Sequence, residues 1–357
     1  TSASGNAFVK AGDDFNVQAT AVQYEGADDA NGDGQPDAGA NLGNNAATPA
    51  FGTEMPAESV TLTSALVAPA IASGANDPGL AAGTTSITTF IGGSGATTTS
   101  FDEVGIIAIN AALTDANYLA SGRNIAGVIN HVGRFYPHHF QLTDNAPALR
   151  DGSASWSCDF TYQGQPFGFS TEPQLTLTAL NASGNPTQNY TGDFWKLAVP
   201  QHSIELDATS PPAGSSCVSA GAIVPGCFSE NSASVSRVWS GTTTYDGEGT
   251  FITGLHTLQV NKLNVIPNSG DIPWSPLLDL VLPQAQLTDS DGACYESGGA
   301  CSEYRINNIS GTELRYGRGW IDNTNGPVMT PLIMTLRLQY WDAAGNFVAN
   351  SADNNGC

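Results

Sequence analysis

The stretch FNVQATAVQY (15–24) alternates apolar and polar residues, so that every second side chain falls on one side of an extended chain. Alternation of this length is typical of a half-buried β-strand. Similar runs recur between Gly, Asn and Asp turn residues, whereas helical periodicity is almost absent. They are ESVTLTSALV (58–67), VGIIAINAAL (104–113), QLTLTAL (174–180) and LIMTLRLQYW (332–341). The sequence therefore predicts an all-β protein of tandem antiparallel, immunoglobulin-like β-sandwiches with long loops.

The segment NHVGRFYPHHF (130–140) closes the first set of alternating runs and contains a proline. All six cysteines follow it. We therefore predict two domains. The first is a β-sandwich with an acidic, calcium-type loop over residues 1–133, and the second is a larger, disulfide-bonded β-sandwich over residues 134–357.

The chain carries 33 acidic and 11 basic residues among 357, a formal net charge of −22. Nucleic acids and anionic membrane surfaces attract clustered Lys and Arg, so this charge argues against both as partners. No run of 18 apolar residues occurs, and no membrane span is predicted. The low content of charged residues, 12%, is typical of secreted bacterial proteins. The chain begins at Thr1 without a signal-like segment, so we expect a mature or trimmed piece of a longer exported protein.

The six cysteines form no C-x-x-C pair, which argues against structural zinc held by thiolates. An even number in an exported chain favours disulfides, although six cysteines allow 15 connectivities. We expect the local pairs Cys217–Cys227 and Cys294–Cys301, which leave Cys158 with the distant Cys357. The alternative is free buried thiols in a reducing compartment.

The stretch DDANGDGQPD (28–37) has the spacing Asp-x-Asn-x-Asp-Gly-x-x-Asp. Alternate residues of a tight loop turn their oxygens toward one point, which suits calcium. Ala40 stands where an EF-hand needs its bidentate glutamate, so the loop is not an EF-hand. The alternative is a solvated Asp/Asn/Gly turn. We predict one structural calcium ion with the ligands Asp29, Asn31, Asp33, Gln35 and Asp37.

Two further groups of metal-ligand residue types are predicted not to bind metal. The acidic stretch DSDGACYESGGACSE (289–303) has incomplete ligand spacing, and its two cysteines account for its shape. His138 and His139 are adjacent, and adjacent residues of a strand point to opposite faces of the sheet. We therefore expect these two histidines not to share an ion.

Trp239 and Trp274 lie beside residues typical of loops and are the candidates for ligand contact. Sugar rings stack on exposed aromatic faces, but tryptophan in β-sandwiches often belongs to the core. No G-x-S-x-G elbow in a strand–helix context, Walker loop or H-E-x-x-H motif occurs. No particular carboxylate pair stands out as that of a glycosidase. We therefore predict that the protein is not an enzyme.

Five segments, taken in order, carry a family resemblance. They are GRFYPHHFQL (133–142), FTYQGQPF (160–167), LTALNASGNPTQNYTGDF (177–194), LRYGRGWIDN (314–323) and LQYWDAAGNFVANSADNNGC (338–357). Together they resemble MshQ-like proteins, which are encoded with mannose-sensitive haemagglutinin type IV pilus systems of Gram-negative bacteria.

The resemblance implies an exported component of the cell surface that serves pilus assembly or adhesion, without catalysis. Its partners would be pilus or cell-surface proteins, or glycans. The sequence leaves two alternatives open. One is a structural stalk or extracellular filament subunit that associates with itself through open sheet edges. The other is a secreted hydrolase.

Overall fold

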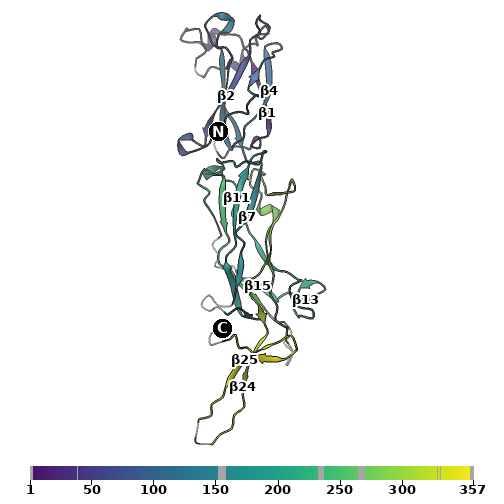
Figure 1. The fold of residues 1–357 in the computed structure, drawn as a ribbon. Coiled ribbons are helices and arrows are strands. Elements are labelled where there is room, and N and C mark those ends of the chain that lie inside the picture. Colours follow the sequence, from purple (N-terminus) through teal and green to yellow (C-terminus); the bar gives the residue numbers. More distant parts are fainter. Residues whose placement is uncertain are drawn as a thin grey trace.

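The computed structural model describes residues 3–37, 39–151, 158–231, 237–263, 270–327, 329 and 331–353. Its regular structure is β-strand apart from short 3₁₀ helices, and the chain forms an elongated rod (Figure 1). The strands make several small sheets, nearly all antiparallel. The prediction of an all-β, sandwich-type fold is therefore confirmed. Among the described residues, no helix has the length and apolar character needed to cross a bilayer.

The first sandwich lies at one end of the rod and packs a two-stranded sheet against a four-stranded sheet. Phe15 and Val17 from the smaller sheet meet Leu62 and Ile107 from the larger one in a single buried cluster. The smaller sheet is β1 (Asp14–Thr20) with β4 (Ser94–Ser100). The larger runs in the order β3 (Ser86–Ile87), β2 (Val60–Ala68), β5 (Gly105–Leu113) and β6 (Ala126–Phe135).

The second sandwich is larger and surrounds its own buried core. One sheet has the order β16 (Val238–Ser240), β17 (Glu248–Ile252), β11 (Gln174–Leu180) and β7 (His139–Asp144). Another has the order β15 (Phe228–Asn231), β18 (Thr257–Val260), β10 (Pro166–Thr171) and β8 (Ala148–Arg150), and a third β12 (Ser203–Leu206), β19 (Leu278–Leu282) and β22 (Tyr304–Ile309). The short pairs are β9 (Thr161–Tyr162) with β23 (Leu314–Arg315), β13 (Val218–Ser219) with β14 (Ala222–Ile223), and β20 (Glu296–Ser297) with β21 (Ala300–Cys301).

The alternating runs become strands because one face of each is buried. In β11, Leu175, Leu177 and Ala179 lie in the core, while Thr176 and Thr178 between them are partly exposed. Four of the five predicted runs behave in this way. The run at 332–341 differs, because its strand begins only at Leu336 and the residues before it are exposed.

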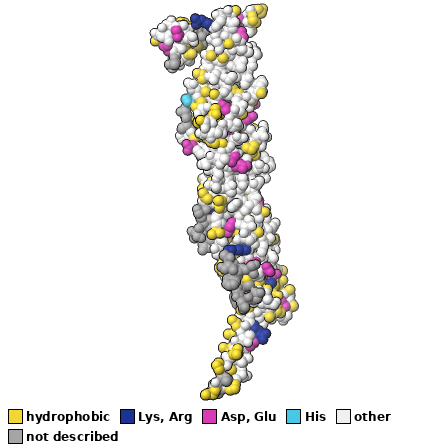
Figure 2. Space-filling view, turned by 60° about the vertical axis from the view of Figure 1, so that its left-hand side comes forward, with side chains coloured by type: hydrophobic (Ala, Val, Ile, Leu, Met, Phe, Trp, Pro, Cys, Tyr) yellow, Lys and Arg dark blue, Asp and Glu magenta, His cyan; other side chains and the backbone are white. Residues whose placement is uncertain are grey.

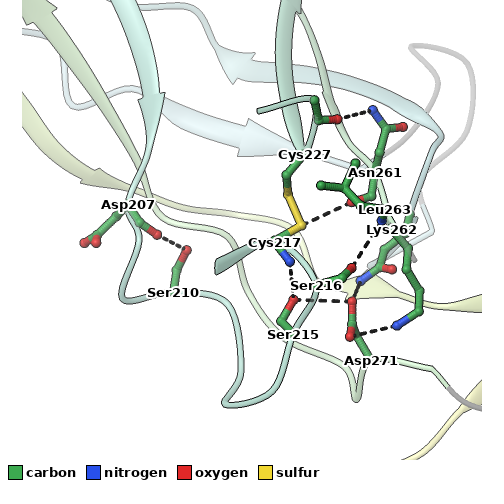
Figure 3. The surroundings of a disulfide bond; sticks show 12 residues. Asp207, Ser210, Ser215, Ser216, Cys217, Cys227, Asn261, Lys262, Leu263 and Asp271 are labelled. Atoms are coloured by element: carbon green, nitrogen blue, oxygen red, sulfur yellow. Dashed lines mark hydrogen bonds and ion pairs between the residues drawn. A yellow bond between two sulfur atoms is a disulfide. The ribbon is translucent and has the colours of Figure 1, made fainter. Parts of the chain in front are cut away.

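Two of the predicted disulfides, Cys217–Cys227 and Cys294–Cys301, are present. The third predicted pair includes Cys357, which lies outside the described residues. Figure 3 shows Cys217–Cys227, whose two cysteines are fully buried. Beside it, the buried carboxylate of Asp271 accepts a hydrogen bond from Lys262 at 3.0 Å. A disulfide that closes a loop as short as the one between Cys217 and Cys227 typically stabilises a fold by about 2–3 kcal/mol.

The two sandwiches meet at a junction centred on the buried carboxylate of Glu103. Its Oε1 accepts hydrogen bonds from the backbone N–H groups of Val104 (2.7 Å) and Asn189 (3.1 Å). Its Oε2 accepts from the backbone N–H of Gln188 at 2.9 Å and from the side-chain amide of Asn76 at 3.3 Å. One side chain therefore satisfies donors from both sandwiches.

The N-terminal segment also lies at this junction (Figure 1). The backbone N–H of Phe8 donates to the carbonyl of Arg134, and that of Ala11 donates to the carbonyl of Tyr136. The carbonyl of Ala11 in turn accepts from the backbone N–H of Ala182 in the second sandwich. The chain therefore enters and leaves the first sandwich at the same place.

A buried ion pair between Arg134 and Asp291 completes the junction. Both side chains are only 6% exposed, and the guanidinium makes a two-pronged contact with the carboxylate. The Nε of Arg134 also donates to the carbonyl of Gly5 at 2.9 Å. This pair joins the end of β6 to a turn that lies far along the chain.

The two cores draw on overlapping stretches of sequence. The first is built from residues between Phe15 and Phe135, and the second from residues between Val104 and Leu314. Beyond the second core, β24 (Gly317–Ile321), β25 (Leu336–Trp341) and β26 (Phe347–Ala349) form a separate three-stranded sheet. The division after residue 133 that we expect from the sequence stays a prediction.

Candidate functional site: an acidic loop and an apolar hairpin

The acidic loop (residues 28–37) folds around the carboxylate of Asp29. Its Oδ1 accepts hydrogen bonds from the backbone N–H groups of Gly32 and Asp33, and its Oδ2 accepts from Gly34. Both glycines have φ near +75°, a conformation that other residues rarely adopt. The Tyr24 hydroxyl donates to Oδ2 at 2.7 Å and thereby lowers the pKa of Asp29. The loop is thus organised around one ionised carboxylate.

Three of the other predicted calcium ligands, Asn31, Asp33 and Asp37, turn their side-chain oxygens toward nearby backbone. The Oδ1 atoms of Asn31 and Asp33 accept from the N–H groups of Asp33 and Gln35, at 2.9 and 2.8 Å. The Oδ2 of Asp37 accepts from the N–H of Ala30 at 2.8 Å. Within the described residues, no three carboxylates of this loop bring oxygens within 4.8 Å of one another. The carboxylates of the loop therefore do not converge on one point, and calcium stays a prediction.

Two carboxylates of the second acidic stretch, residues 289–303, are bound by other groups of the same chain. Asp289 is buried and accepts from the Tyr190 hydroxyl at 2.8 Å and from the N–H groups of Asp291 and Ala293. Burial raises the pKa of Asp289. Asp291 pairs with Arg134 at the junction. These contacts give both carboxylates a role in folding without a metal ion.

The two tryptophans predicted to contact a ligand both pack into the second core. Trp274 is 7% exposed, so it is buried rather than exposed. Trp239 is half-buried, lies edge-on to Trp195 and tilted against Phe251, and donates its indole N–H to the carbonyl of Ala198. Trp274 therefore offers no open face on which a sugar ring would stack, whereas ligand contact by Trp239 stays a prediction.

The side chains of the adjacent histidines His138 and His139 do not point away from each other as expected. Their Nδ1 atoms lie 3.0 Å apart, and both rings approach Glu296. The strand β7 begins at His139, so His138 precedes it and does not follow the alternation of the strand. The expectation that the two rings point to opposite faces is therefore wrong.

Several exposed apolar side chains lie in the C-terminal hairpin, which we define as residues 317–341. Directly paired residues of antiparallel strands share a face of the sheet. Ile321 pairs with Leu336, and Gly319 pairs with Leu338, on one face. The three apolar side chains of this face are 40 to 62% exposed.

The opposite face of the hairpin is polar and internally paired. Arg337 forms an ion pair with Asp322 at 2.7 Å, and the Trp320 indole donates to the same carboxylate. The Nε of Arg318 donates to Gln339 at 2.9 Å. The hairpin is thus amphipathic, although neither face is covered by the described part of the chain.

The connection between the two strands continues the apolar surface. Figure 2 shows hydrophobic side chains along the projecting end of the rod. Contiguous exposed apolar patches are found at contacts with other proteins or with membranes and at ligand-binding grooves. The sequence signal was present in LIMTLRLQYW, but alternation alone does not reveal whether a strand is covered. The exposed large hydrophobic residues described in the connection are Met329, Leu332, Ile333 and Met334.

Three family models match the chain. They are described as DUF6701, second domain, over residues 1–112; DUF6701, third domain, over residues 103–308; and DUF6701, fourth domain, over residues 315–356. The third-domain match alone covers more than half of the 357 residues. The chain belongs to the DUF6701 family. No curated protein and no solved structure matches it.

The acidic loop, the junction and the C-terminal hairpin each fall within the residues matched by the DUF6701 models. The acidic loop lies in the second-domain match, and the C-terminal hairpin lies in the fourth-domain match. Glu103 falls where the second- and third-domain matches overlap, at residues 103–112. The junction therefore joins two domains that the DUF6701 models treat separately.

Proposed function

We propose that this chain is a non-catalytic, exported surface component of a type IV pilus system that serves pilus assembly or adhesion. Its partners are pilus or cell-surface proteins, with glycans as a second class of ligand. The observation that carries the proposal is the amphipathic C-terminal hairpin, which presents an apolar face at the end of a rod. A rod of this kind is suited to holding a contact surface away from its point of attachment.

Other observations support the same proposal. The five segments that resemble MshQ-like proteins span the second sandwich and the hairpin. Two disulfides are compatible with an extracellular location, because disulfides persist in oxidising compartments. The low content of positive charge disfavours nucleic acid as a partner.

The apolar face of the hairpin provides the test. Replacing Leu336 and Leu338 by glutamate should weaken binding to purified pili about 100-fold, since each exposed leucine buried at an interface is worth 1–2 kcal/mol. Binding is measured by biolayer interferometry with pili immobilised. Gln339→Glu is the matched control, because it adds a charge to the polar face and keeps an acceptor for Arg318. Unchanged binding by the double variant would argue against the hairpin as the contact surface.

A second candidate function is a filament subunit that associates head to tail. The strand β6 is the last strand of its sheet, and it exposes Val128 and Ile129. An open edge of this kind can accept a strand from another copy. If the chain is a filament subunit, the wild type should not bind pili. It should instead associate with itself in a concentration-dependent manner in sedimentation velocity, and the Leu336→Glu/Leu338→Glu variant should lose this association.

The proposal includes a structural calcium ion in the acidic loop. The loop already holds its carboxylates and glycines in the order that calcium loops use. Calorimetric titration of the wild type should give about one equivalent of calcium, and Asp33→Ala should abolish it. Binding to the folded state alone stabilises by about 2.7 kcal/mol at a hundredfold excess over Kd, so the melting temperature should rise with calcium.

Asp246→Ala is the control for the calcium experiment. Asp246 is exposed and accepts a hydrogen bond from the N–H of Glu248 in a turn of the same kind, outside the acidic loop. It should leave calcium uptake unchanged. If the wild type takes up no calcium, the stretch is a solvated turn whose oxygens serve its own backbone.

A further inference from the structure

Three side chains that are distant in sequence meet inside the second sandwich. His202 immediately precedes β12, Glu230 lies in β15, and His256 immediately precedes β18. Each offers one donor atom, and the three donor atoms lie within 4.8 Å of one another. The rings of His202 and His256 meet edge to face, with centroids 5.1 Å apart.

The cluster is buried, and its polar atoms are incompletely satisfied. His202 is 9% exposed and His256 is 5% exposed. The Nδ1 of His256 lies 2.8 Å from Oε1 of Glu230. The Nε2 atoms of both histidines are buried and have no hydrogen-bond partner among the described residues. A buried polar atom without a partner costs about 1–3 kcal/mol, so two such atoms in one cluster call for an explanation.

We infer that His202, Glu230 and His256 form a binding site for a divalent transition-metal ion of the zinc class. Two imidazole nitrogens and one carboxylate oxygen are a donor set that zinc accepts, with a fourth position left for water. The aromatic rings of Phe169 and Phe251 lie against the two histidines and limit access of solvent. Such an ion would tie β12 to the β15–β18 pair.

Two neighbouring charges modify this site in opposite directions. The Nε of Arg237 donates to Nδ1 of His202 at 3.3 Å, so the guanidinium competes with a metal ion and repels it. Glu172 contacts the backbone of His256 and adds negative charge beside the site. The arginine is therefore the residue whose removal should strengthen metal binding.

The test uses the full chain, stripped with chelator and held in excess calcium so that the acidic loop does not take up the added metal. Zn²⁺ is titrated by calorimetry, and Co²⁺ by visible absorption, which reports four-coordinate binding. The wild type should bind one equivalent. His256→Ala and Glu230→Gln should each weaken binding at least about 100-fold, and Arg237→Gln should tighten it about tenfold.

The second histidine group provides the control. His138, His139 and Glu296 also bring three donor atoms within 4.8 Å, but they are only partly buried. His139→Ala should leave zinc binding unchanged. Loss of binding in His139→Ala with retention in His256→Ala would overturn the inference, as would the absence of any zinc uptake by the wild type. If near-UV circular dichroism shows that His256→Ala is unfolded, Glu230→Gln and Arg237→Gln decide the outcome.

Discussion

Replacing Asp291 by alanine should lower the free energy of unfolding by about 3–5 kcal/mol. Arg134 is only 6% exposed, and the carboxylate of Asp291 is its charged partner. Without that carboxylate, the guanidinium would remain buried with the carbonyl of Gly5 as a neutral acceptor. The cost comes from leaving one buried charge without its ionic partner.

An exposed ion pair in the same part of the chain gives the comparison. Arg305 and Glu303 lie 2.7 Å apart, but the carboxylate is half exposed. Glu303→Ala should therefore cost less than about 1 kcal/mol. Both variants are measured by urea denaturation followed by far-ultraviolet circular dichroism. Equal costs for the two variants would show that the Arg134–Asp291 pair does not act as a buried one.

Replacing Glu103 by alanine should cost about 3–4 kcal/mol, because it removes the acceptor for several buried donors at once. Those donors are the N–H groups of Val104, Gln188 and Asn189 and the amide of Asn76. They belong to both sandwiches, so the variant should weaken the junction as well as the fold.

The pH dependence of stability distinguishes Glu103 from other acidic residues. Burial raises the pKa of Glu103 to about 7, compared with 4.5 in the unfolded chain. The folded protein therefore keeps the proton over a range in which the unfolded chain has lost it. The resulting stabilisation is fully present below about pH 4.5 and is lost as the pH rises to about 7, a change of about 3 kcal/mol. This slope should disappear in Glu103→Ala.

The distribution of tryptophan makes the coupling measurable. The first tryptophan in the sequence is at position 156, so fluorescence reports the second sandwich and the C-terminal hairpin. In the wild type, fluorescence and circular dichroism should change together with denaturant. In Glu103→Ala they should separate into two transitions. Asp102→Asn, an exposed neighbour, should behave as the wild type. Coincident transitions in Glu103→Ala would mean that other contacts hold the junction.

Much of the fold could be predicted from the sequence, because burial of one face imposes a period of two on each strand. β11 and β1 follow this pattern closely. The two local disulfides could also be predicted, because short loops between cysteines limit their partners. The exposure of the run at 332–341 could not be predicted for the same reason, because an uncovered strand has the same alternation as a covered one.

The residues that meet through the tertiary fold were beyond prediction. Arg134 and Asp291 are 157 positions apart, and nothing in the two stretches that contain them indicates that they pair. His202, Glu230 and His256 come from three strands or their edges, at separations that match no ligand pattern. Trp274 was predicted to be exposed because its neighbours in the sequence are typical of loops, but the tertiary fold buries it.

The position of the N-terminal segment has a mechanical consequence. Residues 8–11 are hydrogen-bonded to residues 134–136 and to Ala182. The shortest connection through covalent bonds and hydrogen bonds from the N-terminal segment to the second sandwich therefore does not pass through the first sandwich. A tensile load applied between the N-terminal segment and the C-terminal hairpin would pass through the junction into the second sandwich. The first sandwich would stay unloaded, and the acidic loop that it carries would keep its geometry while the rest of the molecule is pulled.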